Sequence, residues 1–185
     1  MSYICNAPID LSEVTFFTGS SGKGHGSIPG IGVLLYNEYS TNSSKSKYLD
    51  LRFYRSKNNI PFTISTVQIK ALGLSAHERL TEKNYNRVSN LKLHILDRVS
   101  RSEFISLEKP TQTFIAFFSL KVIEKLFSKK LGEFLESKQI FLSFRTLYLI
   151  EKNCIEISLL DLHIEEQDLD KLFNLIENYG KNYCH

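Results

Sequence analysis

The spacing of apolar residues changes near Ser75, and this change constrains the fold more than any other feature of the sequence. Between Leu49 and Tyr54, apolar and polar residues alternate with a period of two, which is typical of a β-strand with one buried face. From Ser75 onward, apolar residues recur at the helical spacing of about 3.6 residues. A chain with both periods in separate stretches is expected to fold in the α+β class.

Three strand-like segments are predicted before this change of period. They are Ile31–Tyr39, Leu49–Tyr54 and Phe62–Ile69. The connectors between them are polar and rich in Ser and Asn, which favour turns. These features predict an N-terminal antiparallel β-meander.

Two central amphipathic helices are predicted next. The first spans about residues 75–101, because Ser75 and Glu78 have the spacing of a capping box. Pro110 blocks helix continuation, so the second helix is expected at about Ser119–Ser137. The preceding segment, Thr113–Phe118, fits either the first turns of that helix or a separate strand.

The C-terminal third is predicted to form a β-hairpin and a closing helix. The hairpin would join Gln139–Ile150 to Cys154–Ile164 through a short polar turn. Glu165–Tyr179 has apolar residues at helical spacing and an acidic first turn, as the helix dipole favours. The sequence contains no internal repeat and no Pro-rich linker, so we expect one domain over residues 1–185.

A glycine-rich loop is predicted at residues 19–32, which hold six of the nine glycines. Its backbone N–H groups, hydroxyls and Lys23 could together hold a phosphate. Two phosphate-binding motifs do not fit, however. A P-loop requires glycine where Phe17 stands, and the dinucleotide fingerprint requires glycine where Ser27 stands. We therefore expect a surface loop that is mobile or is ordered by a partner.

A row of cations is predicted beside the apolar stripe of the helix at about 75–101, which consists of Leu80, Val88, Leu91, Ile95 and Val99. At about 100° per residue, these side chains fall within about a third of the helix circumference. Such a row suits a helix that lies along a phosphate backbone. The predicted nucleic-acid contacts are Arg79, Lys83, Arg87, His94, Arg98 and Arg101 on the helix, with Lys23 and His25 in the loop.

The leading hypothesis is therefore a small cytoplasmic protein that binds nucleic acid, with structured RNA as the favoured class. The alternative is a non-enzymatic protein–protein interaction module, such as an immunity, inhibitor or chaperone-like factor. Its contact surface would be the acidic segment Glu165–Asp170 or an exposed edge of the meander. A plain solvated helix face explains the same cations, since Glu78 and Glu82 could pair with neighbouring cations.

Three short pieces of the sequence resemble a known family of enzymes. Lys23-Gly24-His25, Ile31-Gly32-Val33 and Tyr85-Asn86-Arg87-Val88-Ser89 resemble, in their order, the CRISPR repeat-processing ribonucleases of type I-F systems. This resemblance implies an RNA-processing endoribonuclease in which His25 helps to cleave RNA and an Arg-bearing helix binds it. The N-terminal strand–helix unit and the C-terminal glycine-rich loop of that family have no counterpart in this sequence.

Other classes of function have little support in the sequence. No histidine or cysteine pair has metal-ligand spacing and no catalytic set converges, so we expect no catalytic residue, metal or cofactor. The cysteines, Cys5, Cys154 and Cys184, lie far apart, as expected of free thiols in the cytoplasm. No apolar run reaches the roughly 18 residues that span a bilayer, so no membrane contact is expected. No oligomeric state is predicted.

Overall fold

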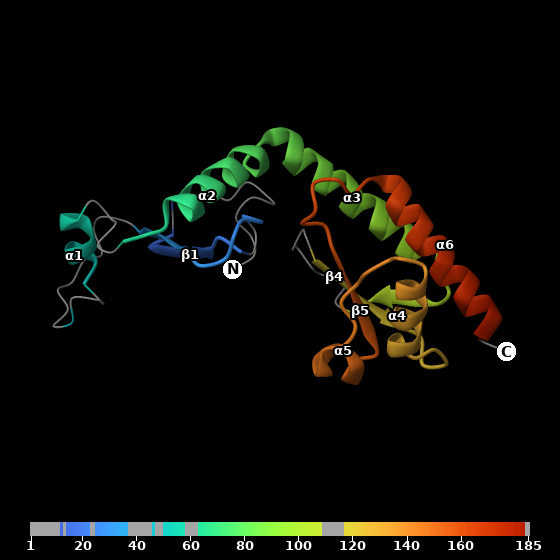
Figure 1. The fold of residues 1–185 in the computed structure, drawn as a ribbon. Helices are drawn as coiled ribbons and strands as arrows, with labels where there is room; N and C mark the ends of the chain where they lie inside the picture. Colours follow the sequence, from blue (N-terminus) through green and yellow to red (C-terminus); the bar gives the residue numbers. More distant parts are fainter. Residues whose placement is uncertain are drawn as a thin grey trace. The chain divides into compact units, whose positions relative to one another are not determined.

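The computed structural model describes residues 12, 14–22, 25–36, 46, 50–57, 63–108 and 117–183. It divides the chain into two compact units, Met1–Thr81 (unit 1) and Glu82–His185 (unit 2). The described residues contain helices and two small antiparallel sheets, which confirms the α+β class (Figure 1). The boundary between the units falls between two helices, where no Pro-rich or Gly-rich linker marks it in the sequence.

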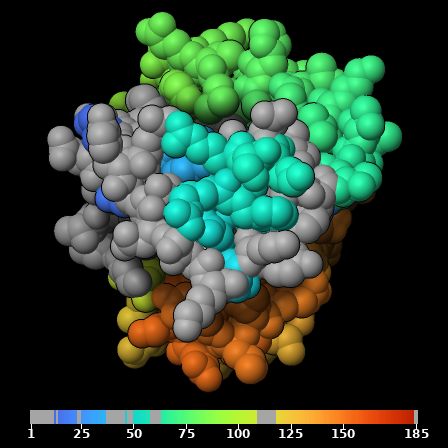
Figure 2. Space-filling view, turned by 90° about the vertical axis from the view of Figure 1, so that its left-hand side faces the viewer, coloured from blue at the N-terminus to red at the C-terminus, as the bar shows by residue number. Residues whose placement is uncertain are grey.

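Unit 1 contains a two-stranded sheet and two helices. Strand β1 (Phe16–Ser20) pairs antiparallel with β2 (Gly32–Tyr36), and the glycine-rich loop connects them. Helix α1 (Leu51–Ser56) lies at the surface of unit 1, where Figure 2 shows it in cyan, and it buries no residue. The longer helix α2 spans Thr66–Arg79.

The predicted meander is confirmed only in its first strand, because β2 lies within the predicted segment Ile31–Tyr39. The predicted strand at 49–54 is wrong: the side chain of Asp50 accepts a hydrogen bond from the backbone N–H of Arg52 and thereby caps α1. The predicted strand at 62–69 is also wrong, since α2 begins at Thr66. The third strand's first residue, Phe62, lies outside the described residues.

Unit 2 has a three-stranded antiparallel sheet in the order β3-β4-β5. Helices α3, α4 and α6 pack with this sheet around a core that includes Ile95, Leu131 and Phe173. The elements of unit 2 are α3 (Glu82–Ser100), β3 (Ile105–Leu107), β4 (Phe117–Val122), α4 (Ser128–Ser137), α5 (Leu147–Glu151), β5 (Cys154–Ser158) and α6 (Glu166–Tyr183). Among the described residues, no helix is both long enough and apolar enough to cross a membrane.

The predicted helix at about 75–101 is two helices. Helix α2 ends at Arg79 and α3 begins at Glu82, so Ser75 lies inside α2 and caps nothing. The second predicted helix, 119–137, is also divided. Its first part belongs to β4, and only the part from Ser128 is helical, in α4.

The predicted C-terminal hairpin is wrong in its pairing. Strand β5 pairs along its length with β4, and the segment before it contributes one isolated bridge, Ser143 to Glu156. Residues 147–151 form helix α5, which the side chain of Thr146 caps by accepting a hydrogen bond from the N–H of Leu149. The closing helix is confirmed as α6, which extends to Tyr183.

Candidate functional site at the glycine-rich loop

The glycine-rich loop is closed at its base by one buried serine. The N–H of Ser21 donates to the carbonyl of Ile31 at 2.9 Å, and its hydroxyl donates to the carbonyl of Ile28 at 2.7 Å. The same hydroxyl accepts from the N–H of Ile31 at 3.1 Å. The N–H of Ser27 donates to the Ser21 carbonyl at 2.8 Å. These bonds give residues 25–31 a defined backbone path.

Helix α2 holds this loop through side chains on one of its faces. Gln68 donates from Nε2 to the carbonyl of Pro29 at 2.9 Å, and the hydroxyl of Ser75 donates to the carbonyl of His25. At about 100° per residue, Gln68, Ser75 and Arg79 lie within about 40° of one another around the helix. Three turns of α2 therefore meet the loop.

Two glycines allow this close approach of helix and loop. Gly26 has a φ of 56° and Gly30 a φ of 121°, conformations that residues with a side chain rarely adopt. A Cβ atom at Gly26 would also collide with the guanidinium group of Arg79. One at Gly30 would lie 2.5 Å from Nε2 of Gln68. Both glycines are required by the backbone and by the side chains that cover it.

The loop also buries groups that can carry chemistry. His25 is 6% exposed, and its burial, followed by the charge of Arg79, lowers the pKa of the imidazole. The imidazole is therefore neutral at pH 7. The hydroxyl of Ser27 is buried and has no hydrogen-bond partner within the described ranges. Lys23 and Gly24 lie outside the described residues, between Gly22 and His25.

The predicted phosphate contacts on the helix do not form one cationic ridge. Arg79 belongs to α2 and faces the loop, whereas the exposed Lys83 belongs to α3. Arg87 turns toward its own chain, where its guanidinium group donates to the carbonyls of Ile164 at 3.2 Å and Leu159 at 3.4 Å.

The remaining cations of that row lie beside acidic or amide groups of unit 2. His94 Nε2 lies 2.9 Å from an oxygen of Asp170, and Arg101 forms an ion pair with Asp97 at 2.6 Å. Arg98 donates to Asn174 at 2.6 Å and lies 3.6 Å from Asp170. These three side chains of the predicted row therefore contact other side chains of this chain.

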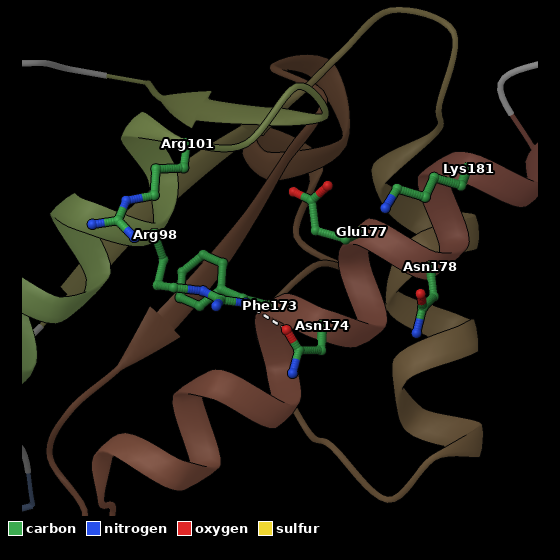
Figure 3. A pocket seen from close by; sticks show the side chains of 7 residues that line it. All are labelled: Arg98, Arg101, Phe173, Asn174, Glu177, Asn178 and Lys181. Carbon is green, nitrogen blue, oxygen red and sulfur yellow. Dashed lines mark hydrogen bonds between the residues drawn. The ribbon is translucent and has the colours of Figure 1, made fainter.

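A second concave site lies between α3 and α6, with a volume of about 480 Å³. Figure 3 shows Arg98 reaching from α3 across the ring of Phe173 toward Asn174 on α6, and the guanidinium carbon lies 5.6 Å from the ring centroid. The residues that line the pocket are Arg98, Arg101, Phe173, Asn174, Glu177, Asn178 and Lys181. The carboxylate of Glu177 accepts a hydrogen bond from Ser102. In the part of the chain that the structure describes, no group of three or more acidic, His or Cys side chains could hold a metal.

Several solved proteins share the fold of this chain. No known protein family and no curated protein sequence matches this chain. The phosphoserine aminotransferase of Bacillus circulans subsp. alkalophilus has a TM-score of 0.80 at 15% identity, with 98% of this chain and 52% of that protein covered. For the ureidoglycine–glyoxylate aminotransferase of Bacillus subtilis the TM-score is 0.76 at 13% identity, with 98% and 51% covered. The alanine–glyoxylate aminotransferase of Nostoc sp. has a TM-score of 0.70 at 16% identity, with 94% and 50% covered.

These likenesses show a shared fold, and this chain spans about half the length of the solved proteins it matches. They overturn the prediction of a nucleic-acid-binding protein, together with its alternatives, an interaction module and an RNA-processing endoribonuclease with His25. Lys23 and His25 were predicted as site residues from the sequence, whereas Gln68 and Ser75 were not predicted as loop contacts. The signal that could have indicated Gln68 and Ser75 is that both lie on the same face of the helix as Arg79.

Proposed function

We propose that this chain is part of an enzyme that transforms amino acids with pyridoxal phosphate as its cofactor. The observation that carries this proposal is the structural likeness to aminotransferases over 92–98% of the chain. An aminotransferase moves an amino group from a donor to an acceptor. It therefore needs a carbonyl group that carries the amino group after it leaves the donor and before it reaches the acceptor. Pyridoxal phosphate supplies that carbonyl, and the enzyme holds it through a lysine amine.

The chemistry of the glycine-rich loop fits this cofactor. Lys23 is the only lysine of the segment 19–32. Its side-chain amine would bind the cofactor at the carbonyl carbon of the pyridoxal group. Nearby in sequence, Ser27 has a buried hydroxyl with no hydrogen-bond partner among the described residues, and the guanidinium of Arg79 covers the loop. A hydroxyl and a guanidinium group are donors that suit a phosphate. The sequence alone predicted no cofactor, and the proposal replaces that expectation.

The chain's own residues would bind and orient this group. When bound, pyridoxal phosphate accepts the electron pair released as a bond at the amino-acid Cα breaks. The amine Nζ of Lys23 would hold or deliver a proton beside that carbon once it is released from the carbonyl. His25 is neutral and buried, so it adds no competing cation next to Lys23. Gln68 and Ser75 would keep the loop in one conformation.

A comparison of two ligands tests this function. The full chain is titrated with pyridoxal phosphate and with pyridoxal, which lacks the phosphate, and binding is followed by equilibrium dialysis. We expect the phosphate form to bind more tightly. Ser27→Ala should reduce this preference by about tenfold, the equivalent of one lost hydrogen bond to a charged group. The hydroxyl makes no hydrogen bond in the described residues, so the variant should fold normally.

Arg101→Gln is the matched control, because Arg101 is a cation of unit 2 that pairs with Asp97. It should leave the preference for the phosphate form unchanged. Equal binding of the two ligands, or an equal loss in both variants, would refute the proposal.

The cytoplasm is the location that we propose with this function. Amino-acid metabolism takes place there, and the buried Cys154 forms no disulfide among the described residues. A reducing compartment preserves such a thiol.

A further inference from the structure

The pocket between α3 and α6 carries more positive than negative charge. Its lining holds one carboxylate, that of Glu177, and the cations Arg98, Arg101 and Lys181. All of its lining residues belong to unit 2. Its volume of about 480 Å³ is in the range of sites that bind small molecules. A ligand of this pocket is therefore expected to be small and negatively charged.

Arg98 is held in place and still has hydrogen-bond donors available. Its guanidinium group packs on the ring of Phe173 and donates to Oδ1 of Asn174 at 2.6 Å. The carboxylate of Asp170 lies 3.6 Å from Arg98, beyond ordinary hydrogen-bond distance, and lies nearer to His94, at 2.9 Å. A guanidinium group has five N–H donors, so several remain for a ligand. Their planar arrangement suits a carboxylate group.

Lys181 is the second cation that is available to a ligand. It follows Asn174 and Glu177 at the spacing of one helix face, so the three side chains lie along the pocket side of α6. Lys181 is exposed and forms no ion pair within the described residues. From Asn174, where Arg98 meets α6, to Lys181 the helix rises by about 10 Å. A single carboxylate or phosphate group is shorter than this rise, whereas two carboxylates joined by a short carbon chain can meet both cations.

The other two charged groups of the lining already have partners. Arg101 forms its ion pair with Asp97 at 2.6 Å. The carboxylate of Glu177 accepts a hydrogen bond from Ser102. Figure 3 shows Glu177 between Arg98 and Lys181, so one available cation lies on each side of it.

We propose that the α3–α6 pocket binds a small dicarboxylate, with one carboxylate on Arg98 and the other on Lys181. The ligand would join the two helices, since Arg98 belongs to α3 and Lys181 to α6. The pocket belongs to unit 2 and the glycine-rich loop to unit 1, so the two sites share no residue. The proposal depends on the charge and geometry of the pocket and not on pyridoxal phosphate.

Calorimetric titration of the full chain tests the class of ligand. It compares glutarate with inorganic phosphate and with valerate, a monocarboxylate that has the same number of carbon atoms. Low ionic strength keeps the screening of the charges small. We expect glutarate to bind at least about tenfold more tightly than the other two, because only glutarate meets both cations. Equal binding of glutarate and valerate, tighter binding of phosphate, or no binding of glutarate would overturn the proposal.

Two variants assign the two carboxylates. Lys181→Gln should weaken glutarate binding by about tenfold and leave valerate binding unchanged. Lys181 forms no ion pair in the described residues, so this variant should fold normally. Arg98→Lys keeps the charge but removes the planar set of donors, so it should weaken the binding of both ligands by about tenfold.

Lys129→Gln is the matched control, because it removes the charge of an exposed lysine of α4 that does not line the pocket. It should change neither affinity. An equal loss in Lys129→Gln and Lys181→Gln would assign the binding to net charge alone and would contradict the proposed site.

Hydrogen exchange locates the bound ligand. At a glutarate concentration of about ten times its dissociation constant, the slowest amides of α3 and α6 should exchange about tenfold more slowly. Exchange in α2 should stay unchanged. Slower exchange in α2 without any change in α6 would contradict the proposal, whether or not pyridoxal phosphate binds.

Discussion

The guanidinium group of Arg79, in the last turn of α2, lies against the backbone of Gly26, a residue with a φ of 56°. This contact joins two positions that are far apart in the sequence. It places a cation over the loop that carries Lys23 and contributes to the lowered pKa of His25. The conformation of the proposed cofactor loop therefore depends on α2. The sequence pattern had divided the residues of this helix between a predicted strand and a predicted nucleic-acid-binding helix.

Gly26→Ala should destabilise the loop. The new methyl group would collide with Arg79 and would hold a side chain at positive φ, at a cost of about 1–2 kcal/mol. Faster hydrogen exchange of residues 25–31 measures this effect. Gly32→Ala is the control, since nothing lies within 4 Å of a Cβ at Gly32. That variant should be neutral or more stable by up to about 1 kcal/mol. Equal losses in both variants would argue against the contact.

The loop should lose stability at acidic pH through His25. Because the folded pKa of His25 is lowered by burial and by Arg79, the unfolded state binds the proton more readily. Stability is therefore fully present above the unfolded pKa, 6.5, and falls as the pH decreases below it. Hydrogen exchange of the loop between pH 8 and pH 5, corrected for intrinsic rates, checks this expectation. His25→Gln should remove the dependence, and an unchanged profile in that variant would assign it to another group.

Arg87→Ala should destabilise unit 2, because Arg87 donates to the carbonyls of Leu159 and Ile164. Leaving these carbonyls without a donor should cost about 1–3 kcal/mol. Lys83→Ala, on the exposed surface of the same helix, should change stability by less than about 0.5 kcal/mol. Urea unfolding of the two variants gives the comparison. Similar midpoints would show that Arg87 is as dispensable as a solvated cation.

Asn153 joins β4, α4 and the start of β5. Its Nδ2 lies within 3.2 Å of the carbonyls of Val122, Ile123 and Leu126, and its Oδ1 accepts from the N–H of Ser128 at 2.7 Å. Asn153→Ala should therefore cost about 3 kcal/mol or more in urea unfolding.

The exposed Asn178→Ala is the control for that variant and should cost less than about 0.5 kcal/mol. Asn153→Asp separates the two halves of the side chain, because it keeps an acceptor for Ser128 and loses the amide donor. A wild-type stability in this aspartate variant would contradict the role of Nδ2.

The predicted apolar stripe of the cationic helix was correct where the helix is continuous. Val88, Leu91 and Ile95 are buried in unit 2, because local periodicity reports which face of a helix meets the core. Leu80, assigned to the same stripe, is exposed, since α2 ends at Arg79. Periodicity continues across a break between helices and so does not reveal it.

Pairing between distant segments was not predictable from local pattern. The segments 139–150 and 154–164 are adjacent and apolar, which favoured a hairpin, yet β5 pairs with β4. The contacts between the glycine-rich loop and α2 were not predictable for the same reason. His25 and Ser75 lie 50 residues apart, and no property of either residue alone indicates the other. Lys23 stands out in the sequence because several glycines lie within ten residues of it. The helix that covers the loop lies more than 40 residues away and leaves no such local signal.

The most direct test of the account is the site of covalent labelling by pyridoxal phosphate. The full chain is incubated with a limiting amount of the cofactor and reduced with borohydride. Peptide mass spectrometry then compares Lys23 with Lys70, an exposed lysine of α2. We expect label concentrated at Lys23, at least about tenfold above Lys70, with its loss in Lys23→Ala and its retention in Lys70→Ala. Label spread evenly over the lysines, and unaffected by Lys23→Ala, would contradict this expectation.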